Sequence, residues 1–155
     1  MFHVRNARSS DVAEMHALIL ELAEYEKAPQ EVIATEGTLH EALFADSPVA
    51  IAWVAELDSV VRGMAICYLR YSTWKGVTLY LEDLIVQEEY RQQGMGRALL
   101  THCIQYAKEK NYQRVSWQVL DWNTLAIEFY KQFNTQFDAG WVNAWVELVD
   151  KDLKL

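Results

Sequence analysis

The stretch that decides the fold runs from Glu82 to Arg97 and reads EDLIVQEEYRQQGMGR. Its first part continues an apolar run, which predicts a buried strand ending near Val86. Two glycines, Gly94 and Gly96, then precede a segment with apolar residues at helical spacing. A strand, a glycine-containing turn and a helix in this order bring backbone N–H groups together at the helix N-terminus, where the helix dipole favours an anion. The stretch therefore predicts an anion-binding turn.

Two basic residues, Arg91 and Arg97, flank this turn, so its charge suits a pyrophosphate. A Rossmann fingerprint would need a third glycine at Leu99, and a Walker motif would need lysine and then serine or threonine where Arg97 and Ala98 stand. Both common nucleotide-binding patterns are therefore excluded. The other interpretation is a turn whose glycines only cap a helix, and the residues of the turn alone leave these two possibilities open.

Hydrophobic periodicity predicts the elements on either side of this stretch. Strands are expected at residues 2–6, 49–57, 60–71, 77–86, 115–120 and 141–149, and helices at 12–26, 38–44, 96–110 and 124–133. Asp58 and Ser59 predict a tight hairpin turn, as do residues 74–76. Strands interspersed with helices indicate an α/β fold with one mixed, mostly antiparallel sheet flanked by helices, in which 77–86 and 115–120 form a parallel pair. No Pro/Gly/Ser-rich linker interrupts the chain, which predicts a single domain over residues 1–155.

Composition excludes several classes of function. The chain has 155 residues, 14 Lys and Arg, 22 Asp and Glu, and a net charge of −8. This charge argues against a nucleic-acid binder and is compatible with a cationic ligand. The apolar run at 49–55 falls short of the ~20 residues that span a bilayer, and residues 1–5 lack signal-peptide features, so we expect a cytoplasmic protein without a membrane partner. Isolated cysteines and the spacing of the four histidines predict no metal site.

Two segments carry a resemblance to a known family. Residues 91–96, RQQGMG, resemble the acetyl-CoA pyrophosphate loop of the GNAT family of N-acetyltransferases, and residues 123–130, NTLAIEFY, resemble its later helix. Residues 21–26, 74–76, 79–83 and 122–123 further resemble the diamine (spermidine/spermine) branch, which includes thialysine acetyltransferases. The chain departs from that branch at 124–126, where the branch has Glu-Pro-Ser, and at 133–134, where it has Arg-Gly.

The resemblance implies direct transfer of an acetyl group from acetyl-CoA to the primary amine of a small cationic substrate, either a diamine or polyamine or a thialysine-like amino acid. Acetyl-CoA would enter where the two parallel strands splay apart. Backbone groups of Leu84, Ile85 and Val86 would pair with the pantetheine arm. Asn123 would help to orient the cofactor, although its position also suits a helix N-cap. The residues that would hold the pyrophosphate are Arg91, Gln92, Gln93, Gly94, Met95, Gly96 and Arg97.

The same resemblance implies roles for catalytic and substrate-binding residues. Tyr130 matches the general acid that protonates the departing CoA thiolate, although it also fits a purely structural aromatic helix face. Glu82 matches the residue that accepts the amine proton through a water or holds the cation. Adjacent strand residues face opposite ways, so only one of Glu82 and Asp83 is expected to face the substrate, and we assign Glu82. Further substrate contacts implied by the resemblance are Tyr25, Glu26, Ser116, Trp117 and Gln118.

Two other functions remain compatible with these motifs. A non-catalytic acyl-CoA-binding sensor would have the same loop, and an acetyltransferase for protein or peptide amines would have the same fold. Family members commonly form dimers, and Trp141 and Trp145 are two pairs of residues apart on the expected closing strand. We therefore expect a homodimer with these tryptophans at its interface.

Overall fold

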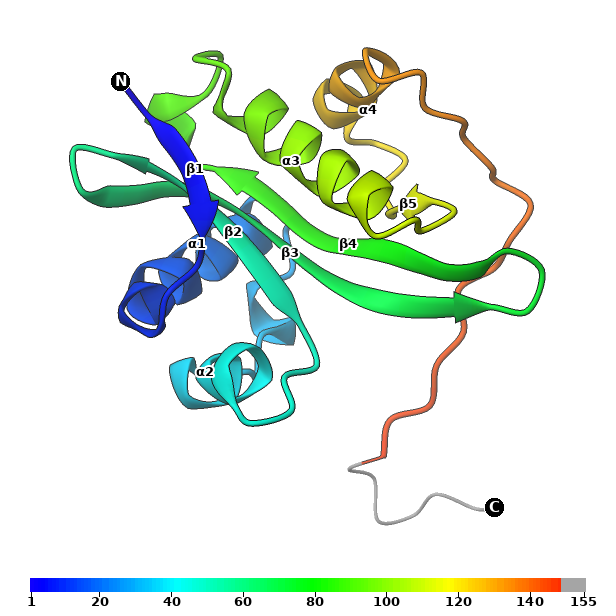
Figure 1. Cartoon of the computed structure of the whole chain (residues 1–155), viewed down its shortest axis with the longest axis horizontal. Coiled ribbons are helices and arrows are strands. Elements are labelled where there is room, and N and C mark those ends of the chain that lie inside the picture. The colour runs from blue at the N-terminus through cyan, green and yellow to red at the C-terminus, as the bar shows by residue number, and fades with distance from the viewer. Residues whose placement is uncertain (149–155) are drawn as a thin grey trace. The chain divides into compact units, whose positions relative to one another are not determined.

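The computed structural model describes residues 1–148 and divides the chain into two compact units, Met1–Gln118 and Val119–Leu155. The first unit contains a five-stranded sheet in the order β1-β2-β3-β4-β5 (Figure 1). All neighbours are antiparallel except β4 and β5, which are parallel, so the expected mixed α/β sheet is confirmed. The elements of this unit are β1 (His3–Asn6), α1 (Val12–Tyr25), α2 (Glu36–Phe44), β2 (Ile51–Leu57), β3 (Val60–Ser72), β4 (Gly76–Val86), α3 (Met95–Glu109), β5 (Val115–Ser116) and the 3-10 turns η1 (Ser9–Asp11), η2 (Pro29–Glu31) and η3 (Glu88–Tyr90).

Helices cover both faces of this sheet (Figure 1). On one face, Met15 and Leu18 of α1 and Leu39 of α2 pack in a single buried cluster with side chains of β2, β3 and β4, among them Ile66. On the other face lies α3, where the thiol of Cys103 is 3.8 Å from that of Cys67 on β3. Apolar side chains along β2 to β4 therefore point alternately to the two faces of the sheet and form two cores, one on each side.

The hairpin turns lie where the sequence predicts them. Asp58 and Ser59 have φ angles of 51° and 62°, the left-handed pair that a two-residue hairpin turn requires. Gly76 has φ of 77° at the turn into β4, where glycine has no steric penalty. The hairpin of β3 and β4 extends beyond the other strands (Figure 1).

Two β-bulges interrupt the sheet, and the sequence did not predict either of them. Between β2 and β3, Ala55 pairs with Gly63 and Glu56 with Val61, so Arg62 is an extra residue on β3. A second bulge, between β3 and β4, inserts Glu82 as an extra residue on β4. A bulge bends its strand and redirects the side chain of the inserted residue, and bulges are frequent beside active sites.

The second unit holds α4 (Thr124–Lys131), and its N-terminus is capped as expected. The Asn123 side-chain oxygen accepts a hydrogen bond from the Ala126 N–H at 3.2 Å. Asn134 has φ of 56°, the left-handed conformation that asparagine tolerates after a helix.

Two expected strands differ from the structure. Residues 141–148 form no strand, so the predicted closing strand at 141–149 is wrong over this range, and residue 149 lies outside the described part of the chain. The strand expected at 115–120 comprises only Val115–Ser116. The single domain expected for residues 1–155 stays a prediction. Within residues 1–148, no helix has the length and apolar character that a bilayer span requires.

Candidate active site

The two parallel strands diverge soon after they meet. Leu79 pairs with Val115 and Tyr80 with Ser116, and β5 then ends while β4 continues to Val86. In the sheet formed by the described residues, β5 is the neighbour of β4 on that side. The second half of β4, from Leu81 onward, therefore has an open edge on which an extended ligand can form backbone hydrogen bonds.

The bulge of β4 is at Glu82, and it brings two carboxylates to one face of the sheet. Leu81 pairs with Cys67, which contacts α3, so Leu81 faces α3 and Glu82 faces the α1 side. Asp83 pairs with Ile66, which belongs to the cluster around α1, so Asp83 faces that side as well. The expectation that only one of these acids faces the substrate side is therefore wrong, because the inserted residue breaks the alternation.

Further acidic and phenolic groups lie close to these carboxylates. The rings of Tyr68 and Tyr80 are 5.1 Å apart, and the pKa of each is raised by burial and by the charge of Glu82. Burial raises the pKa of Glu26, which caps the C-terminus of α1. Burial also raises the pKa of Asp83 to about 6, and the charges of Glu82 and Glu26 raise it further in the same direction. Asp83 thus lies within reach of the charges of two further carboxylates, and such a cluster is a site that a cation would stabilise.

This arrangement predicts a pH-dependent stability effect at Asp83. Its pKa is about 6 in the folded protein and near 3.8 ordinarily, so the folded state binds the proton more tightly than the unfolded state. Stability is therefore lost as the pH rises from about 4 to about 6, by about 2 kcal/mol once partial exposure to solvent is allowed for. Asp83→Asn should have little effect at pH 4 and raise the free energy of unfolding by that amount at pH 7.5.

Urea unfolding of the parent and of Asp83→Asn across this pH range measures the difference. Asp46→Asn, at an exposed position of the same chain, is the matched control and should stay within about 0.5 kcal/mol of the parent. A difference between Asp83→Asn and the parent that does not vary with pH would contradict the assignment.

The loop after β4 has the geometry of an anion site. Gln92 and Gly94 have φ angles of 62° and 88°, so the chain turns sharply before α3 begins at Met95. A Cβ atom on Gly94 would meet nothing within 4 Å, so its backbone conformation, and not crowding, requires glycine there. The first hydrogen bond of the helix runs from the Ala98 N–H to the Gly94 carbonyl, so the N–H groups of Met95 and Gly96 precede the helical ladder and can bind an anion.

Arg91 connects this loop to the end of α1 and to the end of β4. Its Nε donates to the Val86 carbonyl at 3.0 Å, and its guanidinium lies 5.1 Å from the centre of the Tyr25 ring. The Glu88 N–H also donates to the Glu21 side chain of α1 at 3.2 Å. Because the Val86 carbonyl already accepts one hydrogen bond, the open edge of β4 is chiefly at Leu84 and Ile85.

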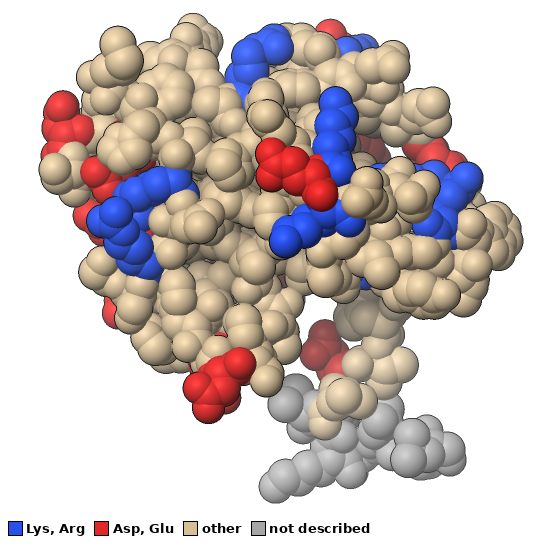
Figure 2. Space-filling view, viewed as in Figure 1, with Lys and Arg blue, Asp and Glu red and all other residues tan. Residues whose placement is uncertain are grey.

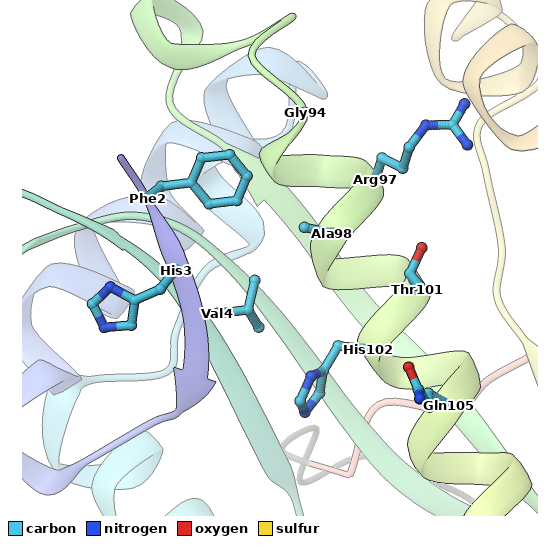
Figure 3. A pocket seen from close by; sticks show the side chains of 9 residues that line it. All are labelled: Phe2, His3, Val4, Gly94, Arg97, Ala98, Thr101, His102 and Gln105. Carbon is cyan, nitrogen blue, oxygen red and sulfur yellow. The ribbon is translucent and has the colours of Figure 1, made fainter.

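One flank of the loop opens into a surface depression of about 510 Å³ between β1 and α3 (Figure 3). Arg97 extends away from Phe2 and Val4, whereas His102 points toward Val4 (Figure 3). The face shown in Figure 2 carries acidic and basic side chains in small separate groups among uncharged ones. Within residues 1–148, His, Cys, Asp and Glu form no group of three that could hold a metal ion.

The remaining candidates divide between the two units. Ser116 ends β5, while Trp117 and Gln118 follow it outside the strand. Asn123 and Tyr130 belong to the second unit, where both are buried and the Tyr130 ring lies edge to face with Phe129 at 5.3 Å between centroids. The structure thus brings together Tyr25, Glu26, Glu82 and the loop 91–97 in the first unit.

Sequence reasoning missed the side of the sheet that Asp83 faces and the bulge at Arg62. Asp83 stands out in the sequence as an acid within an apolar strand. It was not assigned to the site, because strict alternation places it on the face opposite to Glu82. Arg62 had only a weak signal, a single cation in the apolar run 60–67. No residue pattern in β3 or β4 indicates where an extra residue is inserted.

Comparisons with known proteins agree with this fold. The family model described as "Acetyltransferase (GNAT) family" matches residues 13–134. Thialysine N-epsilon-acetyltransferase of Bos taurus is 37% identical over 141 residues, which cover 86% of this chain and 83% of that protein. The Mus musculus protein of the same name is 34% identical over 151 residues, 90% of this chain and 89% of that one. An aminoglycoside acetyltransferase from a soil metagenome, solved with trehalose, superposes with a TM-score of 0.78 at 20% identity and covers 95% of this chain and 96% of its own, which shows the fold alone.

Proposed function

Because the chain belongs to the acetyltransferase (GNAT) family, we propose that this enzyme transfers an acetyl group from acetyl-CoA to the primary amine of a small cationic substrate. The observation that carries the substrate class is the cluster of Glu26, Glu82 and Asp83 on the α1 side of the β4 bulge. A diamine, a polyamine or a thialysine-like amino acid has a second positive charge that such a cluster stabilises. The names of the thialysine acetyltransferases at 37% and 34% identity support the same class.

In this proposal acetyl-CoA binds along the open edge of β4. Leu84 and Ile85 would pair with the pantetheine arm, with Val86 at the end of the edge. The pyrophosphate would lie on the N–H groups near Gly94 and Gly96, with Arg91 and Arg97 supplying positive charge. The sharp turn at Gln92 and Gly94 and the start of α3 support this assignment.

The reaction joins the amine nitrogen to the thioester carbonyl carbon, and the bond from that carbon to sulfur breaks. The amine must first lose its proton, and at pH 7 a Lys-like ammonium costs about 4.6 kcal/mol to deprotonate. We assign proton acceptance, through a water, and cation binding to Glu82. Tyr130 returns a proton to the CoA thiolate, and Asn123 orients the cofactor while capping α4. Further substrate contacts are assigned to Tyr25, Glu26, Ser116, Trp117 and Gln118.

An acetyl-transfer screen with matched amines tests the substrate class. We expect 1,3-diaminopropane to exceed propylamine in kcat/KM by about 10- to 100-fold, because only the diamine keeps a second charge for the carboxylates. Thialysine, spermidine, an aminoglycoside and a peptide with a free N-terminus complete the panel. Equal rates for the two propyl amines would contradict the acidic site. Acetyl-CoA binding without transfer to any amine would favour a sensor, and transfer to the peptide alone would favour a protein acetyltransferase.

The proposal extends to assembly and location. Trp141 and Trp145 are 78% and 77% exposed, and large exposed aromatic side chains are typical of interfaces, which supports a homodimer. The sequence has two isolated cysteines, too few for a disulfide framework, which supports a cytoplasmic location. The net charge of −8 favours a small cationic partner over nucleic acid.

A further inference from the structure

The inserted residue of the β2–β3 bulge, Arg62, contacts the segment that leads into the glycine loop. Its Nη1 donates to the Gln87 side-chain oxygen at 3.0 Å, and its guanidinium carbon lies 4.4 Å from the centre of the Tyr90 ring. Its backbone carbonyl accepts the Gln87 N–H at 2.9 Å. Arg62 therefore holds both ends of the segment 87–90, with hydrogen bonds at Gln87 and a stacked ring at Tyr90.

The segment 87–90 determines where the glycine loop starts. It connects the end of β4 to Arg91, after which Gln92 and Gly94 adopt left-handed backbone angles. Two arginines hold the segment between β4 and the glycine loop. Arg91 contacts Tyr25 of α1, and Arg62 of β3 contacts Tyr90. N–H groups that are already aligned bind an anion more tightly, because less loop entropy is lost on binding.

The stability of the fold does not explain Arg62 well. Within the described residues, its buried Nε has no hydrogen-bond partner. A buried donor without an acceptor destabilises a protein, and an unbranched apolar side chain of similar length would remove that defect. An arginine that stands at a bulge with this defect points to a role in function.

We propose that Arg62 is a positioning residue of the acetyl-CoA loop, which it aligns through Gln87 and Tyr90 before the cofactor binds. This inference rests on the proposed binding of acetyl-CoA by residues 91–97. Arg62 acts through its two partners and takes no part in the chemistry. Its removal should therefore change cofactor affinity and leave the amine site unchanged.

Arg62→Met is the first test, with acetyl-CoA affinity measured by calorimetry and steady-state kinetics on the full chain. We expect the Kd and the KM for acetyl-CoA to rise about tenfold, because one hydrogen bond and one cation–π contact are lost. The kcat and the KM for the amine should stay within about twofold. The melting temperature should change little, because removal of the unpartnered Nε offsets the loss of these two contacts.

Changes at the partner residue separate positioning from a general loss of stability. Tyr90→Leu removes the ring and should weaken acetyl-CoA binding, whereas Tyr90→Phe keeps the ring and should bind like the parent. In the double variant Arg62→Met with Tyr90→Leu, the fold-loss of acetyl-CoA affinity should be smaller than the product of the two single losses, because both changes remove the same contact. Arg8→Met, at an exposed arginine preceding η1, is the matched control and should leave the affinity for acetyl-CoA unchanged.

The outcomes distinguish this inference from the proposed function. If the parent protein does not bind acetyl-CoA, the proposed function fails and the inference fails with it. If the parent binds and Arg62→Met binds equally well, only the inference is overturned. A loss of affinity that follows a fall in melting temperature, or an equal loss in Tyr90→Phe, would also overturn it.

Discussion

Replacing Tyr130 by phenylalanine should lower kcat by about 10²- to 10⁴-fold, the range that a positioned proton donor contributes. The substitution keeps the aromatic ring and its edge-to-face contact with Phe129, so the packing of α4 should be preserved. The departing CoA thiolate, with a thiol pKa near 8.5, would then have to take its proton from water. Because the change affects the leaving group and not cofactor binding, the Kd for acetyl-CoA should stay within about twofold.

Stopped-time assays of CoA release, together with calorimetry, measure both quantities for Tyr130→Phe. Tyr71→Phe is a matched control, because its side chain is 73% exposed on the β3 hairpin and removal of its hydroxyl should leave kcat unchanged. An unchanged kcat for Tyr130→Phe would remove the tyrosine from the chemistry and leave it a packing residue. A large rise in the Kd for acetyl-CoA would place the hydroxyl in cofactor binding instead.

Local patterns predicted most of the first unit. Asp58 and Ser59 predict a two-residue turn, and the apolar spacing after Gly96 predicts α3, because both patterns lie within a few neighbouring residues. The glycine loop was found for the same reason. Its left-handed Gly94 and the helix start that follows it depend on the local chain.

Features that depend on a neighbouring strand were not predictable in this way. The alternating pattern at 141–148 suits a strand, but a strand needs a partner that supplies backbone hydrogen bonds, and sequence alone does not identify one. At Arg62 and at Glu82 one strand has one residue more than the facing segment of its partner, and this depends on the pairing of two strands, which the residues of one strand alone do not reveal. The sequence therefore predicted which residues belong to the site. The side of the sheet that Asp83 faces depends on the register of β3 against β4, which the sequence did not predict.

The second large effect is expected at Glu82, where the glutamine variant should lower kcat/KM for a dicationic amine by about 10²-fold. Glutamine keeps the size of the side chain but neither accepts the amine proton nor attracts the cation. The two assigned roles affect different constants. Loss of a base lowers kcat at saturating amine, whereas loss of a cation contact raises the KM for the amine.

The pH dependence of Glu82→Gln separates these roles further. A free amine needs no base, so a deficit in kcat caused by the missing base should shrink as the pH approaches the amine pKa near 10.4. If Glu82 only binds the cation, the variant should instead have a raised KM for the amine at neutral pH and no deficit in kcat. Glu41→Gln, at an exposed position on α2, is the matched control and should behave like the parent. Glu82→Gln with unchanged kcat and KM would transfer the acidic role to Asp83, which the bulge places on the α1 side of the sheet, and to Glu26 at the end of α1.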